Sequence, residues 1–190
     1  MGSPRIRMPY GSRWARIGVV ALIGLGGLPL GSALAAPPMQ QTIAALPAVT
    51  LDYCAEPEEV AFLSIINNYR TQNGLQPLRL SQTLGAAAAT HSDHMATTSY
   101  FDHTMADGTT VVQNIRNHGY TGETYGENIA AGTETADYAF STFQNSAPHN
   151  QNMLLASYES IGIARAYDPN SGYGWYWTTI FGGKLDYPAD

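Results

Sequence analysis

Apolar residues recur at helical spacing in the first patterned stretch of the chain. The stripe has four members at i, i+3, i+4 and i+7: Phe62, Ile65, Ile66 and Tyr69. This period is typical of a helix that buries one face. Pro57 suits the first turn of such a helix, and two acidic residues after it face the positive end of the helix dipole. We therefore predict a helix that begins at Pro57 and ends before Gly74.

Three more helices are predicted further along the chain. The second runs from the capping residue Ser81 to about Thr97, because small and apolar residues share one stripe of it. The members of that stripe are Leu84, Ala88, His91 and Met95. The third covers residues 109–118 and stops at Gly119. The stretch "TADYAFSTF", with its two phenylalanines, predicts the fourth.

After the helices the apolar period changes from helical to alternating. "SIGIARAY" and "YGWYWTTIF" are rich in β-branched and aromatic residues, and the turn formers "DPNSG" lie between them, which predicts a β-hairpin. Trp175 and Trp177 fall on one face of the last strand and Tyr176 on the other. These rings could line an apolar groove, but we expect at least one face to be core. Helices first and strands last indicate an α+β fold, with the helices packed on a small, mainly antiparallel sheet.

The first 35 residues have the pattern of an export signal. Four arginines precede an apolar run over residues 17–30, and the small-residue stretch "GSALAA" follows. Ala33 and Ala35 form an A-x-A site, so we expect cleavage after Ala35 and a secreted, extracellular mature chain with no transmembrane span. An uncleaved membrane anchor is the alternative. Glycines and Pro29 interrupt the run, however, and it is short for a span of roughly 20 residues.

The mature chain fits one domain of roughly 155 residues, which is large enough for a single core. Prolines without periodicity mark residues 36–55 as an N-terminal linker. Residues 56–184 then form the folded domain, and residues 185–190 form a C-terminal tail. Cys54 is the only cysteine of the chain, so no intramolecular disulfide can form. Its thiol is either unpaired or joined to another chain.

Charge excludes two classes of partner. The export signal contains four of the nine basic residues of the chain and none of the fifteen acidic ones. The mature chain therefore carries a formal net charge of about −10, so it has no basic surface with which to release counterions from nucleic acid. The same charge gives no attraction to anionic lipid.

Three polar residues lie at the end or outside of the predicted elements: His103 in "YFDHT", Glu127 in "YGENIAAG" and His149 in "SAPHNQNML". Loop residues on a rigid scaffold are where binding sites are usually built. Two imidazoles and a carboxylate also form a ligand set that zinc accepts, with a fourth position left for water. The alternative for Glu127 is structural, since its carboxylate could accept hydrogen bonds from nearby backbone and hold its glycine-flanked turn in place.

The remaining histidines have simpler explanations. His91 and His94 stand at i, i+3 like a metal pair, but His91 lies on the apolar stripe of its helix. We interpret His91 as a core histidine that bonds to backbone, and His94 as solvated. His118 stands beside the helix-ending Gly119, where an imidazolium suits the negative end of the helix dipole.

Five motifs occur together in one order along the chain: "YFDHT..DG", "GYTGETYGENIAAG", "FQNSAPHNQNML", "SIGIARAY" and "GYGWYWTTIFGG". In this order and approximate spacing they resemble the CAP superfamily, the cysteine-rich secretory, antigen 5 and pathogenesis-related 1 proteins. The resemblance runs from about Pro57 to Gly183. It is closest to the bacterial, cysteine-poor branch of SCP-like extracellular proteins.

The resemblance implies an α-β-α sandwich with a broad cleft in which two histidines and up to two glutamates can hold a divalent cation, zinc or another. Matched by motif, the metal-binding residues are His103, Glu127 and His149. The second glutamate of the family falls on Ser146, which joins the cleft residues without its carboxylate. His91 also matches a family position within the helix.

Three functions compete at this point. The first is a binding module whose cleft holds a cation and a lipid, a sterol or a cell-envelope component. The second is a metal-dependent hydrolase with Glu127 as general base. The chain has no G-x-S-x-G or H-E-x-x-H motif, and Ser146 could pair with His149 only if it is not the replacement of a ligand. The third is a surface interaction protein without catalytic activity. We rank binding above interaction and both above catalysis.

Overall fold

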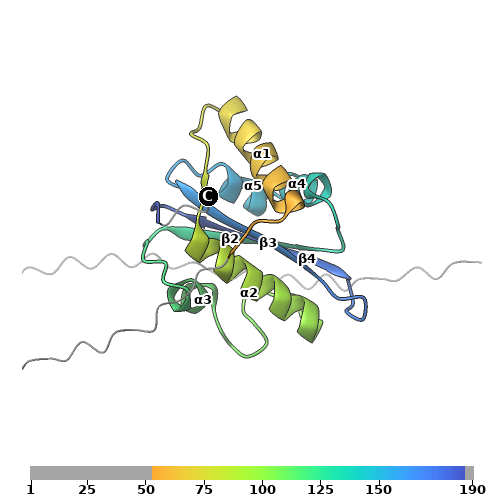
Figure 1. Cartoon of the computed structure of the whole chain (residues 1–190). Coiled ribbons are helices and arrows are strands. Elements are labelled where there is room, and N and C mark those ends of the chain that lie inside the picture. The colour runs from red at the N-terminus through yellow and green to blue at the C-terminus, as the bar shows by residue number, and fades with distance from the viewer. Residues whose placement is uncertain (1–52, 187–190) are drawn as a thin grey trace, which may run out of the picture. The chain divides into compact units, whose positions relative to one another are not determined.

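The computed structural model describes residues 53–186, which form a mixed sheet with helices on both faces (Figure 1). The helices are α1 (Pro57–Gln72), α2 (Gln82–Thr98), α3 (Val111–Asn117), α4 (Ala136–Gln144) and α5 (Ala147–Met153). The strands are β1 (Arg79–Leu80), β2 (Tyr125–Ala131), β3 (Ser160–Tyr167) and β4 (Trp175–Gly182). The architecture is the α+β, α-β-α sandwich expected from the sequence.

The four strands have the order β1-β3-β4-β2. The short β1 pairs in parallel with β3, while β3 with β4 and β4 with β2 are antiparallel. The predicted hairpin is therefore the centre of the sheet. β2 is an edge strand, so its side chains can reach elements on both faces and beyond the edge.

The helices divide between the two faces of the sheet. Figure 1 shows α1, α4 and α5 in one layer and α2 with α3 in the other. Because side chains alternate along a strand, Trp177 and Phe181 of β4 pack under α1 and α4, together with Phe62 and Phe143. The opposite face of β4 packs toward α2 in two further apolar clusters, which include Ile180 and Tyr176. Both faces of the last strand are therefore core, whereas the sequence led us to expect this of at least one face.

The sequence patterns locate four of the helices and the hairpin. Ser81 caps α2 through the backbone N–H of Leu84, and Thr110 begins α3 with a capping box that includes Gln113. His118 ends α3, and its Nδ1 lies 2.9 Å from the carbonyl oxygen of Asn114. The patterns missed α5, β1 and β2. Of these, β2 and α5 matter most, because both carry residues of the candidate site.

Packing begins before the first helix. Tyr53, which the sequence placed in the linker, is buried, and its hydroxyl donates to the carbonyl oxygen of Ile163 on β3. Cys54 beside it is exposed. The predicted export signal, the linker before residue 53 and the tail after residue 186 lie outside the described residues.

A close approach between α2 and β3 fixes the distance of this helix from the sheet. A Cβ atom at Gly162 would overlap the backbone carbonyl of Leu84 and the amide of Gly85. Backbone cannot move aside as a flexible side chain can, so only glycine fits at this point of β3.

We therefore expect Gly162→Ala to lower the free energy of unfolding by about 1–3 kcal/mol or more, the cost of overpacking a well-packed core. Urea denaturation followed by circular dichroism measures this. Gly172→Ala in the β3–β4 loop is the control, because its new Cβ would come only into ordinary contact with Ser99. Equal stability of the two variants would contradict the close approach.

Candidate functional site

The alternation of β2 places two neighbouring polar side chains on opposite faces of the sheet. Glu127 pairs in register with Ile180 and points toward α2, where it contacts His91. Asn128 pairs with Thr179 and points toward α5, where its amide donates to the carbonyl oxygen of His149. Both side chains are buried. The edge strand thus connects the two helical layers at one place.

The Glu127 carboxylate is shared between two imidazoles. Its Oε2 lies 2.7 Å from Nδ1 of His91, and its Oε1 lies 2.7 Å from Nδ1 of His103. Only 2% of the Glu127 side chain is exposed. Burial pushes the pKa of Glu127 upward, but the hydrogen bonds from His103 and His91 outweigh it and hold this pKa below its usual value. The carboxylate is therefore ionised at neutral pH.

His91 joins Glu127 to the segment that carries His103. Its Nδ1 faces the carboxylate, and its Nε2 lies 3.1 Å from the carbonyl oxygen of Asp102. His91 is 1% exposed, and its two ring nitrogens contact the Glu127 carboxylate and this carbonyl oxygen. It acts as a positioning residue for Glu127 and for the loop after α2.

His103 stands in that loop with a side chain that is 53% exposed. Its Nδ1 donates to Glu127, which leaves Nε2 as the free nitrogen of the ring. The hydrogen bond to Glu127 raises the pKa of His103, burial of part of the ring lowers it, and the charges of Glu127 and Asp102 add to the rise. The net result is a pKa above the ordinary 6.5. Glu127 therefore sets both the tautomer and the basicity of His103.

His149 comes from the other face of the sheet, on α5. Amide groups hold this helix to β2: Asn152 donates to the carbonyl oxygen of Glu127 at 3.2 Å and to Oδ1 of Asn128 at 2.9 Å. The His149 ring packs edge-on against Phe143, with 5.3 Å between ring centroids. Burial lowers the pKa of His149, and the positive charge of nearby His103 lowers it further. His103 and His149 thus lie close enough to interact.

The nitrogen Nδ1 of His149 is buried and has no hydrogen-bond partner among residues 53–186. A buried polar atom without a partner costs free energy and requires an explanation. Within the same residues, no hydrogen bond joins Ser146 to His149. Ser146 is instead the residue before the first turn of α5, and its carbonyl oxygen accepts the backbone N–H of Asn150 at 2.8 Å.

The site therefore differs in part from the expectation. Glu127 and His149 were expected at the end or outside of elements, but they lie within β2 and α5. Only His103 is a loop residue. Glu127 contacts His103 directly, whereas His149 approaches from across the sheet edge. His91 is buried and bonds to backbone as expected, but its second bond to Glu127 was missed.

The donor set can be compared with what a metal ion requires. Within residues 53–186, no group of three His, Cys, Asp or Glu side chains is arranged to hold a metal ion. Both oxygens of Glu127 already accept an imidazole N–H. Nε2 of His103 and both ring nitrogens of His149 make no hydrogen bond within these residues, so they are the donors left for a cation. Glu127 orients the first of these rings through its Nδ1.

Comparison with known proteins assigns the chain to a family. Residues 63–181 match the sequence model of the cysteine-rich secretory protein family, CAP. The chain belongs to the CAP family. A curated relative of this CAP domain, the uncharacterized protein YkwD of Bacillus subtilis strain 168, is 30% identical over 126 residues. The match covers 66% of this chain and 47% of YkwD, so the chain spans about half the length of that relative.

Solved structures share the CAP fold. An extracellular protein containing an SCP domain from Bacillus anthracis matches with a TM-score of 0.60 and 24% identity, over 67% of this chain and 40% of that chain. An outer surface protein from Borrelia burgdorferi matches with a TM-score of 0.61 and 22% identity, over 68% of this chain and 95% of that chain. Both relatives are thus described as extracellular or outer-surface proteins. No helix within residues 53–186 is long and apolar enough to cross a membrane.

The shared carboxylate gives a testable stability effect. Glu127→Gln keeps the shape but removes the buried negative charge to which both imidazoles bond, so we expect a loss of about 3–5 kcal/mol in the free energy of unfolding. Urea denaturation at a series of pH values measures it. Glu123→Gln is the control, because the Glu123 side chain is 92% exposed and paired only with Arg116. This control should unfold like the wild type.

The loss should also depend on pH. The pKa of Glu127 is depressed, so its contribution is present above the ordinary 4.5 and is lost as pH falls through the lower, folded-state pKa. The pKa of His103 is raised, so its contribution is present below 6.5 and is lost as pH rises through the higher, folded-state pKa. The difference between wild type and Glu127→Gln should be largest between pH 4.5 and 6.5. A difference that does not change from about pH 4 to about pH 9 would show that these groups are not coupled.

Proposed function

We propose that this chain is an exported CAP-domain protein whose cleft holds a divalent cation through His103 and His149 and binds a lipid, a sterol or another component of the cell envelope. The observation that carries the proposal is the pair of uncommitted imidazole nitrogens. One is oriented by Glu127, and the other is buried without a partner among residues 53–186.

The chemistry of the two nitrogens favours a cation. A carboxylate that accepts the Nδ1–H of a histidine orients the ring and raises the basicity of Nε2, as in many zinc sites. Burial and the charge of His103 hold the pKa of His149 below 6.5, so its imidazole is neutral at neutral pH. Zinc accepts imidazole ligands and would supply a Lewis acid with positions left for water or a ligand. The proposed cleft also includes Ser146 and Glu127.

Exposed aromatic side chains close to His103 in the sequence support a lipid-like ligand. Tyr100, Phe101 and Tyr173 are each at least 40% exposed, and the rings of Phe101 and Tyr173 are in contact, with 5.9 Å between centroids. Exposed aromatic side chains that gather in one place are typical of binding surfaces. A ligand with an apolar body could lie on these rings with its polar end at His103.

Export is supported by two independent lines. The first 35 residues have the pattern of a signal peptide. The two fold relatives are described as an extracellular and an outer-surface protein. We therefore include secretion of this chain in the proposed function.

The hydrolase alternative is less well supported. A general base must be able to take a proton from a water molecule or a substrate. The Glu127 side chain is 2% exposed, and each of its oxygens already accepts an N–H. This environment favours a role for Glu127 in orienting the His103 ring over a role as general base.

The test is the effect of Zn²⁺ on thermal unfolding. A cation that binds the folded state at a hundredfold excess over Kd adds about 2.7 kcal/mol, which corresponds to a rise in Tm of several degrees. His103→Ala and His149→Ala should each abolish the rise, and Glu127→Gln should reduce it less. His118→Gln, which removes an imidazole at the end of α3, should keep it.

The same experiment has a predicted pH dependence. Protons compete with the cation for Nε2 of His103, and the pKa of this residue lies above 6.5. As the pH is lowered, the rise in Tm should therefore begin to shrink while the pH is still above 6.5. No rise in the wild type, or a rise that survives both histidine variants, would remove the cation from the proposal. Hydrolysis of an ester or peptide that needs Zn²⁺ and Glu127 would favour the enzyme.

A further inference from the structure

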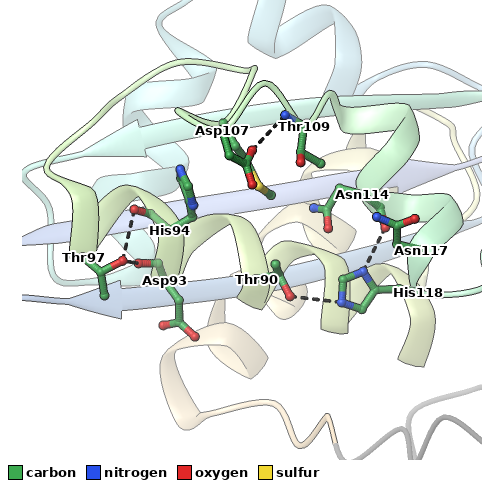
Figure 2. A pocket seen from close by; sticks show the side chains of 10 residues that line it. Thr90, Asp93, His94, Thr97, Asp107, Thr109, Asn114, Asn117 and His118 are labelled. Carbon is green, nitrogen blue, oxygen red and sulfur yellow. Dashed lines mark hydrogen bonds between the residues drawn. The ribbon is translucent and has the colours of Figure 1, made fainter.

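The groove between α2 and α3 encloses about 470 Å³ (Figure 2), but its polar walls do not call for a ligand. Nε2 of His94 accepts the backbone N–H of Ala106 at 2.9 Å, and Figure 2 shows the Asp93 carboxylate directed away from Asp107. None of the side chains that line this groove is a buried polar group without a partner in the described part of the chain. Groups of that kind lie on the opposite face of the sheet.

Two buried side-chain atoms without a partner lie in the layer of α5. They are Nδ1 of His149 and Oγ1 of Thr179, and no group within residues 53–186 forms a hydrogen bond to either. Thr179 is 0% exposed, so bulk solvent does not reach its hydroxyl. A buried polar atom loses the free energy of hydration unless it bonds to protein or to an ordered water molecule. The described side chains do not supply that partner.

The alternation of β4 gives the face on which Thr179 lies. Trp177 and Phe181 belong to the apolar cluster that packs under α1 and α4, so Thr179 between them faces the same layer. Thr178 faces the other layer, where its hydroxyl accepts a hydrogen bond from Ser92 at 2.9 Å. Of these two neighbouring threonines, one therefore has a protein partner and the other has none within the described residues.

Asn128 connects Thr179 to His149. It pairs in register with Thr179 across β2 and β4, and Cβ atoms of such a pair are about 4.5–5.5 Å apart. Its Nδ2 donates to the carbonyl oxygen of His149 at 3.0 Å. The His149 ring also packs edge-on against Phe143, which belongs to the same apolar cluster as Trp177. The Thr179 hydroxyl and the buried edge of the His149 ring thus flank one asparagine.

The Asn128 amide supplies a third polar group at this place. Asn128 is 0% exposed, and its Oδ1 accepts from Asn152 at 2.9 Å. Its NH₂ group has two hydrogens, and the bond to the His149 carbonyl uses one of them. The other has no acceptor among residues 53–186. An internal water molecule typically makes about three hydrogen bonds to groups of this kind, which the hydroxyl, the ring nitrogen and the amide N–H provide.

We propose that Thr179 is a positioning residue for His149 and acts through one internal water molecule, which also bonds to the Asn128 amide. The water takes the inward nitrogen, Nδ1, and leaves Nε2 of His149 to the cleft. Nε2 has no partner within the described residues either, but it is not a buried atom.

This inference rests on the proposed cation site and names the nitrogen of His149 that would bind the cation. A histidine that ligates a metal typically donates its other N–H to a carboxylate, a carbonyl or a water molecule. Glu127 has that role behind His103. Thr179 and its water have the same role behind His149, from the other face of the sheet.

The first experiment is NMR of the metal-free protein at about pH 8, where the His149 imidazole is neutral. A ROESY spectrum of the wild type should show a cross-peak between water and the side-chain amide of Asn128. Thr179→Val keeps the side-chain shape without the hydroxyl, so it should remove this cross-peak and shift the ¹⁵Nδ1 resonance of His149. Thr179→Ser keeps the hydroxyl and should retain both signals. Thr178→Val is the matched control, because it makes the same change on the opposite face of β4, and it should also retain them.

The second experiment is a titration of the same proteins with Zn²⁺. Thr179→Val should weaken Zn²⁺ binding by about tenfold, the lower end of the loss seen when a group behind a metal ligand is removed. Thr179→Ser and Thr178→Val should bind like the wild type. The ¹⁵N shifts of the zinc-loaded wild type should place the metal on Nε2 of His149.

Four results would each overturn the inference. They are a wild type without the water cross-peak at Asn128, a cross-peak that survives in Thr179→Val, zinc on Nδ1 of His149, and a Tm of Thr179→Val above that of the wild type. The last would mean that the hydroxyl is buried without any partner, because removal of such a group stabilises a protein. A wild type that does not bind Zn²⁺ would remove the proposed cation, and the metal-free spectra would still decide whether Thr179 positions His149.

Discussion

The buried Glu127 carboxylate, shared between two imidazoles, is the interaction on which the rest of the site depends. A carboxylate that is 2% exposed loses several kcal/mol of hydration and needs hydrogen-bond partners to offset the loss. His91 and His103 provide them at 2.7 Å each, a distance typical of hydrogen bonds to an ionised carboxylate. Through these bonds one side chain joins β2, α2 and the loop after α2. His91 also contacts the carbonyl oxygen of Asp102. The loop is therefore held at two neighbouring residues, at Asp102 by His91 and at His103 by Glu127.

The edge position of β2 lets this network reach the other helical layer. Glu127 points to one face and Asn128 to the other, and Asn128 with Asn152 holds α5 against the strand. His149 on α5 is thereby brought near His103, although the two histidines come from opposite layers. A site built this way is rigid on the side of Glu127 and has its free imidazole nitrogens at the sheet edge. That geometry suits the capture of a ligand better than proton transfer by the carboxylate.

Much of the fold could be predicted from the sequence, because helical and alternating periods are physical consequences of burying one face. Periodicity does not predict an element that is very short, or one in which small residues make the alternation of apolar and polar positions unclear. β2 reads "YGENIAA", in which a glycine and two alanines obscure the period. α5 has a single buried residue, Met153, so it has no apolar stripe. The apolar stripe of its helix correctly placed His91 in the core. Periodicity, however, predicts only the face of the helix on which a residue lies, and not which side chain of another element it contacts.

The protonation of the two rings that Glu127 joins is the most direct measure of the central claim. The ¹⁵N chemical shifts and one-bond couplings of the imidazoles at about pH 8 report which nitrogens carry protons. If Glu127 organises the site as an ionised acceptor, neutral His103 should carry its proton on Nδ1, with Nε2 free. A proton on Nε2 of neutral His103 would contradict this account.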